Sequence, residues 1–376
     1  MSDTDNTIAT IDDNNKIDKY TNNSENVNGE MRISKIIFDN KKSQRLRQRV
    51  KNLLKKKQPE QRSPEWFQAR NSIITASEVA SCLTMSKKTC ENYVKLYNIE
   101  KFKYNDNKSA NAYDDLNEYI IKKCKSFYGE NVFKDSVYTL WGKKYEPIAV
   151  NLYKKVKNTD VYDFGLLKHP YLSWLGASPD GITPDGVMLE IKCPYSRKIK
   201  EGYIPFHYYC QVQIQLQTTL LDEADFMECE IKEMPSLEEY NECKEIKGII
   251  INNTCEPDNS ETKYIYQDNN DKRDPETWCN ETLTELNSAV PASTVPASTV
   301  PVYTVLYYRI PKYSILNIKK DQEWFDNVKS DIKTIHEKIK FYQNNKEEFL
   351  KYQNEIYNLK NKKHLKNVEN SVCLLD

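Results

Sequence analysis

Two carboxylates and a lysine lie close together in the middle of the chain, in a pattern that predicts a β-hairpin. Asp180 follows a Ser-Pro pair, and Glu190-Ile191-Lys192 begins ten positions after it. The Thr-Pro-Asp-Gly sequence at 183–186 has strong turn chemistry. We therefore expect strands over 174–178 and 187–193 to pair, with Asp180 beside Glu190.

Strand alternation would place Glu190 and Lys192 on one face and Leu189 and Ile191 on the other. Two hard oxygen ligands next to a cation suit Mg²⁺ and a phosphate ester. The alternative is structural, because Asp-Gly ends many hairpins and Glu-x-Lys is common on solvated strand faces. The hairpin alone leaves both interpretations open.

Composition narrows the class of protein. The 376 residues contain 55 basic and 55 acidic side chains, so no global charge indicates a nucleic-acid binder. No apolar run is long enough to span a bilayer, and the acidic N-terminus lacks a signal sequence, which favours an intracellular protein without membrane contact. The ten cysteines form no Cys-x-x-Cys, and the four histidines have no ligand spacing, so zinc ribbons, iron–sulfur clusters and histidine catalysis are disfavoured.

The N-terminal 57 residues are predicted to form a separate head. Residues 1–30 are polar and predicted to be disordered. Residues 41–57 contain nine lysines and arginines and no acid, and the apolar positions Leu46, Val50, Leu53 and Leu54 have helical spacing. This basic amphipathic helix could be a solvated helix end, or it could contact DNA or act as a localisation signal.

A main domain is predicted over 58–345, followed by a helical tail over 346–376. Ser63 is a helix N-cap before Pro64, a second helix begins at Thr75, and 233–302 looks like an insertion that ends in a Val-Pro pentapeptide repeat. Further helices are expected over 141–155, 206–221 and from Phe325 to Tyr342, and strands over 227–231 and 302–310.

Four motifs occur in an order that resembles a known family: PEWFQARNSIITASEV at 64–79, LWGKKYEPIAVNLY at 140–153, GASPDG and LEIKCPYS within 176–196, and YYCQVQIQLQ at 208–217. They are similar to the lambda-type phage exonucleases and the YqaJ-like viral recombinases, a branch of the PD-(D/E)xK nucleases. The resemblance implies an α/β fold with a restriction-endonuclease-like core, in which helices flank a mixed central β-sheet.

The resemblance also implies roles for the residues around the hairpin. Asp180 and Glu190 look like Mg²⁺ ligands, with the backbone carbonyl of Ile191 as a further ligand and Glu146 near the metals. Lys192 looks like the residue that positions or deprotonates the attacking water, because a lysine near metals can be shifted towards its neutral form.

Other motif positions imply supporting roles. Gln211 and Tyr208 match positions that hold the lysine, and Arg70, Thr75 and Ser77 match the pocket for a 5′-phosphate end. Arginine can grip a terminal phosphate with two hydrogen bonds. The structural alternatives are that Arg70 pairs with a surface acid, that the glutamines form a solvated helix face, and that Glu146 is helix-surface charge.

The hairpin and the resemblance together predict a Mg²⁺-dependent DNA exonuclease that uses two ions, with Mn²⁺ as a substitute. The 5′→3′ direction, the action on duplex ends and the 5′-phosphomonoester products are what the resemblance implies. Double-stranded DNA is the expected substrate. The resemblance further implies a large DNA virus as the source, a single-strand annealing protein as partner, a homotrimer, and a location in the host cytoplasm, viral factory or virion. The alternatives are a structure-specific or restriction-like endonuclease and a non-catalytic DNA-binding module.

Overall fold

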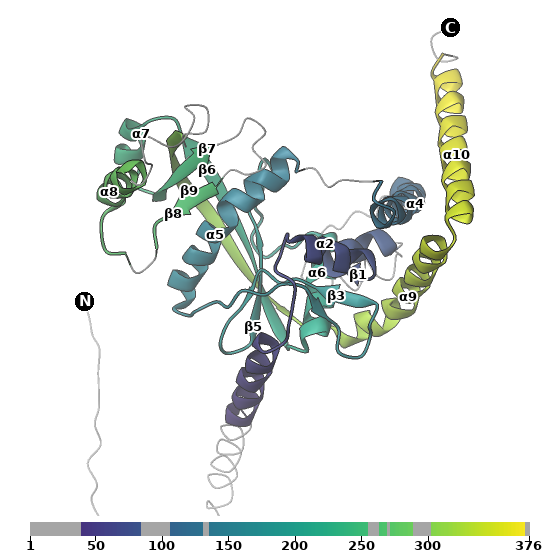
Figure 1. Ribbon diagram of the computed structural model, residues 1–376, viewed down its shortest axis with the longest axis horizontal. Coiled ribbons are helices and arrows are strands. Elements are labelled where there is room, and N and C mark those ends of the chain that lie inside the picture. The colour runs from purple at the N-terminus through teal and green to yellow at the C-terminus, as the bar shows by residue number, and fades with distance from the viewer. Residues whose placement is uncertain are drawn as a thin grey trace, which may run out of the picture.

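A mixed six-stranded sheet forms the centre of the molecule (Figure 1). The structure is a computed structural model that describes residues 39–83, 106–130, 135–254, 263–268, 271–288 and 302–372. In the main sheet β5 pairs in parallel with β6 and the other neighbours are antiparallel, which confirms the predicted mixed α/β class. The strand order is β4 (Gly181–Ile182), β5 (Val187–Lys192), β6 (Glu223–Met234), β9 (Val302–Lys319), β7 (Ile246–Thr254) and β8 (Lys263–Tyr266).

The hairpin that carries Glu190 is formed by β4 and β5. Its turn is the predicted one: Gly186 has a φ of 87°, which favours glycine, and its amide donates to the Thr183 carbonyl at 3.0 Å. The prediction that 174–178 is the partner strand is wrong. That segment contains β3 (Leu175–Ala177), which lies between β1 (Ile74–Thr75) and β2 (Leu167–Lys168) in a second sheet. Pro179 lacks an amide hydrogen and separates β3 from β4, so the strand does not continue.

Two helices cover opposite faces of β5. Leu189 and Ile191 pack with Tyr145 of α5 (Val137–Lys157). Met188, on the other face, packs in the cluster that contains α6 (Phe206–Thr219). Because side chains alternate along a strand, Glu190 and Lys192 face α6.

The last strand, β9, is longer than predicted and crosses the sheet between β6 and β7. The sequence predicts that this strand ends at Ile310, before Pro311. The register with β6 shifts between Glu230 and Lys232, opposite this proline. A local irregularity accommodates a residue that cannot donate to the ladder, and the strand therefore continues to Lys319.

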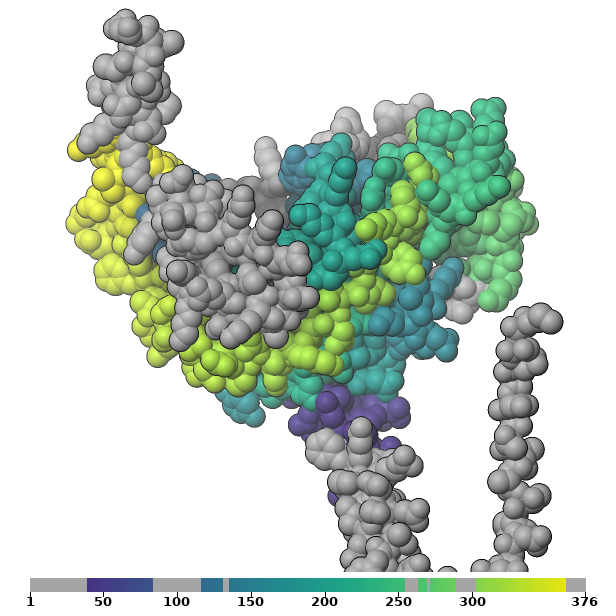
Figure 2. All heavy atoms as spheres, turned by 180° about the vertical axis from the view of Figure 1, so that it is seen from behind, coloured from purple at the N-terminus to yellow at the C-terminus, as the bar shows by residue number. Residues whose placement is uncertain are grey.

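A helical lobe packs beside the sheet, visible as the yellow-green end in Figure 2. It joins α9 (Gln322–Asn344), α10 (Lys346–Val372) and α4 (Asp106–Phe127), with α2 (Pro64–Asn71) against α4. Ile120, Ile339 and Phe349 meet in its core. The predicted apolar stripe of α9 is confirmed, since Phe325, Ile332 and Ile339 are buried.

The segment predicted as an insertion adds to the sheet at the opposite end, shown in green in Figure 2. It contributes β7, β8, α7 (Leu237–Glu242) and α8 (Pro275–Ser288). Trp278 and Ile251 are buried together in a small core of their own. The Val-Pro repeat lies outside the described residues.

The basic N-terminal segment is helical over 39–54. Leu46, Val50 and Leu53 are buried in the main core, whereas Leu54 is 41% exposed. Two of its arginines are paired: Arg45 with Asp222 at 2.8 Å and Arg47 with Asp185 at 2.7 Å. This helix therefore packs on the sheet domain, while the boundaries at residues 57 and 345 stay predictions. The polar segment 1–30 lies outside the described residues.

Candidate active site

Asp180 is fixed against β5 by the backbone. It immediately precedes β4, and its Oδ2 accepts a hydrogen bond from the amide of Ile191 at 2.7 Å. This bond places the Asp180 carboxylate next to the residue that follows Glu190. The predicted juxtaposition of Asp180 and Glu190 therefore arises from the β4–β5 register together with one side-chain contact.

Glu190 is completely buried, yet both of its oxygens have donors. Oε1 accepts from the Lys192 ammonium and from Nε2 of Gln211 at 2.6 Å. Oε2 accepts from Nε2 of Gln215, also at 2.6 Å. These hydrogen bonds compensate for the loss of water around a buried carboxylate and fix its orientation.

Lys192 lies between this carboxylate and an aromatic ring. Its Nζ is 5.1 Å from the centroid of the Tyr208 ring, and the supporting role of Tyr208 stays a prediction. Burial lowers the pKa of Lys192, but the carboxylates of Glu190 and Asp180 outweigh that effect and raise it above its ordinary value. Gln211 contacts Glu190 rather than Lys192, and the two residues meet through a shared acceptor, since both donate to Oε1 of Glu190.

A cavity of about 650 Å³ opens beside this cluster, between α2, α4, α5 and the 3₁₀ helix η1 (Ala76–Cys82). Glu146, Arg70 and Ser77 line it, so the structure brings together predicted residues that are far apart in sequence. Glu146 accepts a hydrogen bond from Arg62 at 3.2 Å. Thr75 is buried, and its hydroxyl donates to Glu78 at 2.8 Å.

Arg70 is held at the wall of this cavity by three groups. Its Nη2 donates to the Ser77 hydroxyl at 3.3 Å and lies 3.6 Å from Oε1 of Glu78. The centre of its guanidinium lies 4.3 Å from the centroid of the Trp66 ring. The ring of Trp66 is in turn tied to the Ser178-Pro179-Asp180 loop, since its Nε1 donates to Ser178 Oγ at 2.9 Å.

The carboxylates fit a divalent cation. Burial raises the pKa of Asp180, and the neighbouring Glu190 and Glu146 carboxylates raise it further, whereas Lys192 lowers it. Negative charge is thus concentrated where hard oxygen ligands meet, and a cation there would relieve the repulsion. Across the described ranges no group of three or more His, Cys, Asp or Glu side chains forms a complete ligand set. Two carboxylates plus water suit Mg²⁺, which usually keeps several waters.

Sequence reasoning missed two residues of this region. Gln215 is four residues after Gln211 on α6, so both amides reach the same carboxylate; this helical spacing was a usable signal. Lys123 of α4 contacts Glu78, and it comes from a segment between the motifs in which the sequence shows no recognisable chemistry.

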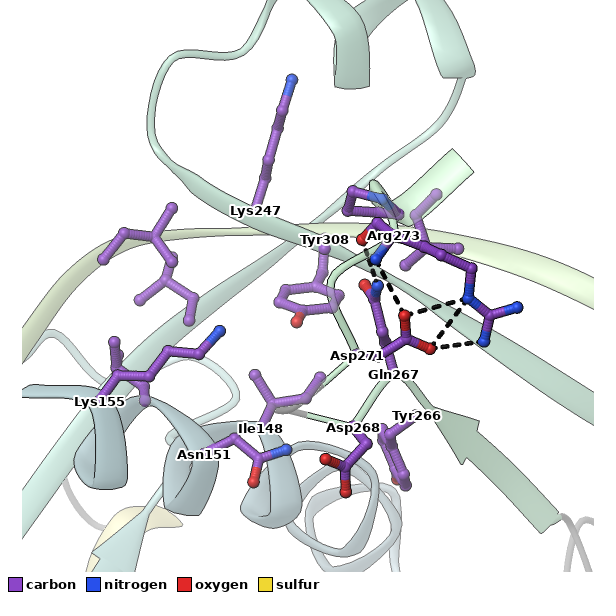
Figure 3. A pocket seen from close by; sticks show the side chains of 16 residues that line it. Ile148, Asn151, Lys155, Lys247, Tyr266, Gln267, Asp268, Asp271, Arg273 and Tyr308 are labelled. Carbon is purple, nitrogen blue, oxygen red and sulfur yellow. Dashed lines mark hydrogen bonds and ion pairs between the residues drawn. The ribbon is translucent and has the colours of Figure 1, made fainter. Parts of the chain in front are cut away.

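A second cavity, of about 280 Å³, lies between α5 and the strands of the insertion (Figure 3). None of the predicted site residues lines it. Two of its charges are paired with each other: Arg273 bonds Asp271 through two nitrogens, and it also donates to Glu281. We therefore place the candidate active site at the cluster of Asp180, Glu190 and Lys192 and at the adjoining cavity of about 650 Å³.

Two carboxylates and a lysine on one hairpin of a mixed sheet are the arrangement that the PD-(D/E)xK resemblance implies. Residues 65–222 match the model of the family described as the YqaJ-like viral recombinase domain. That range contains every predicted site residue, from Arg70 to Gln211.

A curated viral protein is also similar to this chain. It is the uncharacterized protein R354 of Acanthamoeba polyphaga mimivirus, 30% identical over 199 residues. The match covers 48% of this chain and 31% of the relative, so the chain spans about a third of the length of the protein it matches.

Among solved structures, a similar fold occurs in an alkaline exonuclease from Laribacter hongkongensis in complex with dAMP. The sequence identity is 18% and the TM-score is 0.41, and the match covers 80% of this chain and 98% of that one. A phage-related exonuclease from Haemophilus somnus 129PT matches at 14% identity and a TM-score of 0.33, with 69% and 94% covered. Within the described residues, no helix is long and apolar enough to cross a membrane.

Proposed function

We propose that this protein is a divalent-metal-dependent DNA exonuclease that digests duplex DNA 5′→3′ from its ends and releases 5′-phosphomonoesters. One observation carries the proposal: Asp180, Glu190 and Lys192 meet at the β4–β5 hairpin, beside a cavity lined by Arg70 and Glu146. The YqaJ-like viral recombinase domain over 65–222 supports it, because this range includes the whole cluster.

Asp180 and Glu190 would hold the metal, with the Ile191 carbonyl and Glu146 as further ligands and two Mg²⁺ or Mn²⁺ ions as the full complement. When bound, such ions stabilise the negative charge of a phosphodiester under attack and lower the pKa of water. The protein supplies orientation, since Gln211 and Gln215 fix both oxygens of Glu190 at 2.6 Å. Lys192 donates from the same side and would hold the attacking water or a phosphate oxygen.

The cavity beside the carboxylates would receive the 5′ end of the DNA. Arg70 and Ser77 line it and offer a guanidinium and a hydroxyl to a terminal phosphate. Thr75, being buried, would act through Glu78 rather than by touching the phosphate. Binding of a terminal phosphate there would determine which phosphodiester bond lies at the carboxylates.

The biological setting belongs to the same proposal. A mimivirus relative and a viral recombinase domain favour a role in viral DNA recombination or replication, with duplex DNA as substrate and a single-strand annealing protein as partner. A homotrimer, and a place in the host cytoplasm, viral factory or virion, complete the hypothesis.

Linear duplexes labelled at either the 5′ or the 3′ terminus of one strand test the direction of digestion. With Mg²⁺, we expect 5′ label to appear at once as a mononucleotide, while 3′ label stays in long products until late. Early release of 3′ mononucleotides would overturn the polarity. Internal fragments would favour the endonuclease alternative, and binding without any cleavage would favour the non-catalytic one.

A further inference from the structure

Glu78 is the centre of a hydrogen-bond cluster in the wall of the candidate phosphate pocket, which Glu78 and Lys123 both line. Its Oε2 accepts from the amide and the hydroxyl of Thr75, at 2.9 and 2.8 Å. Nζ of Lys123 lies 2.8 Å from both carboxylate oxygens. The Lys123 side chain is only 5% exposed, so its ammonium contacts the Glu78 carboxylate rather than solvent.

Arg70 is a weaker partner of the same carboxylate. Its Nη2 is 3.6 Å from Oε1 of Glu78, which is an ion-pair distance but too long for a good hydrogen bond. Its hydrogen bond goes to Ser77, which faces the cavity. Burial raises the pKa of Glu78, but Lys123 and Arg70 lower it more, so the carboxylate is ionised and competes for any cation near it.

The geometry points to Lys123 as a positioning residue for Arg70. By occupying both oxygens of Glu78, Lys123 keeps Arg70 from closing onto that carboxylate and leaves its guanidinium available to a terminal phosphate in the cavity. This inference rests on the proposed function, and it gives α4 a defined part in selecting 5′-phosphorylated ends. In this role Lys123 acts through Glu78 rather than by contacting the phosphate.

The substitution Lys123→Met tests this directly. The side chain keeps its length and fills the buried space, but Glu78 loses its nearest cation and is left with Arg70 as its basic partner. We expect the preference for 5′-phosphorylated over 5′-hydroxyl duplex ends, measured as a ratio of kcat/KM values, to fall by about 10-fold or more, the effect of losing one charged hydrogen bond. Lys125→Met is the matched control, since Lys125 lies on the same helix and contacts Tyr357 instead.

A second substitution separates positioning from packing. In the double variant Lys123→Met with Glu78→Gln, no carboxylate remains at this position to capture Arg70, so the end preference should return towards wild type. Glu78→Gln alone should bind 5′-phosphorylated ends at least as tightly as wild type, measured by fluorescence anisotropy in Ca²⁺. A folded Lys123→Met variant with full preference, a double variant without recovery, or weaker phosphate binding by Glu78→Gln would each overturn the inference.

The outcome also distinguishes this inference from the proposed function. If wild-type protein digests DNA without regard to the 5′-phosphate, or digests none, the proposed function fails in that respect and the role of Lys123 fails with it. If wild type prefers phosphorylated ends, Arg70→Ala abolishes the preference and Lys123→Met keeps it, the positioning role alone is refuted. Circular dichroism spectra confirm folding of each variant.

Discussion

Nε2 of Gln215 lies 2.6 Å from Oε2 of Glu190, so the oxygen that Gln211 does not reach is held by the next turn of α6. Both residues of this pair are completely buried. The opposite atom of the amide, Gln215 Oε1, is buried without a hydrogen-bond partner among the described groups. An unsatisfied oxygen has an energetic cost, which is tolerable where the nitrogen orients a functional carboxylate.

Gln215→Met should therefore lower the cleavage rate or the apparent metal affinity by about 10- to 100-fold, the usual effect of removing a group that orients a metal ligand. Cleavage measured against Mg²⁺ concentration would show it. Gln217→Met serves as control, because Gln217 is buried on the same helix but donates to Gln322, away from Glu190. Equal effects of the two substitutions would reduce Gln215 to a packing residue.

Lys192→Met should bind DNA like wild type but turn over at least about 100-fold more slowly, because it removes a donor at the reacting phosphate. Glu190 keeps its two amide donors, so the fold should survive. Single-turnover cleavage at saturating protein measures the chemical step, and Lys198→Met, at an exposed position nearby, is the control. A Lys192→Met variant that cuts at the wild-type rate would refute the catalytic role.

The ionisation of Asp180 should change the stability of the folded protein. Burial and the adjacent Glu190 and Glu146 carboxylates raise its pKa in the folded state above the unfolded value. Between these two values the folded protein binds more protons than the unfolded chain, so this group's contribution to stability is lost as pH rises. Asp180→Asn cannot ionise. In EDTA, its Tm should exceed that of wild type, by a margin that grows as the pH rises above the ordinary pKa of an aspartate, about 4.

Mg²⁺ should reverse the order of the two melting temperatures, so that wild type melts above Asp180→Asn. A cation bound by the native carboxylates stabilises the wild type, and the variant, lacking one ligand, should gain less. Thermal melts of both proteins with and without Mg²⁺ measure the effect. The account is contradicted if Asp180→Asn has the lower Tm in EDTA at neutral pH, or if Mg²⁺ raises its Tm as much as that of wild type. Asp180 would then not be a metal ligand whose charge destabilises the metal-free protein.

The N-terminal helix gives a stability prediction. Leu53 is 1% exposed in the main core, whereas its neighbour Leu54 is 41% exposed. Leu53→Ala should lower the free energy of unfolding by about 2–5 kcal/mol, as expected for a buried leucine. Leu54→Ala should change it little. Urea denaturation compares the two, and equal effects would mean that the helix does not pack on the domain.

How much of this site could be predicted from sequence depends on the distance between the partners. The pairing of Asp180 with Glu190 is predictable because a turn with strong local chemistry connects them. The segment over 174–178 is a different case. Its central residues form a strand as predicted, but the strand's partners are decided by packing against β1 and β2. Local propensity carries no information about that choice.

The same limit applies to Lys123 and to β9. Lys123 reaches Glu78 from a helix 45 positions further along the chain, and nothing near it in sequence indicates the contact. Proline at 311 is a strong stop signal for a strand, yet β9 passes through it because β6 pairs with β9 on both sides of the irregularity. Tertiary context overrode a local rule at Pro311, and at Lys123 it supplied a contact for which no local rule exists.

Digestion of one plasmid in linear and covalently closed circular forms tests the central claim most directly, namely that the Asp180–Glu190–Lys192 cluster hydrolyses DNA from ends. With Mg²⁺, the wild-type protein should digest the linear form with release of mononucleotides and leave the circle intact, and EDTA or Asp180→Asn should abolish the reaction. Nicking or cutting of the circle, or unchanged digestion by Asp180→Asn, would contradict the account.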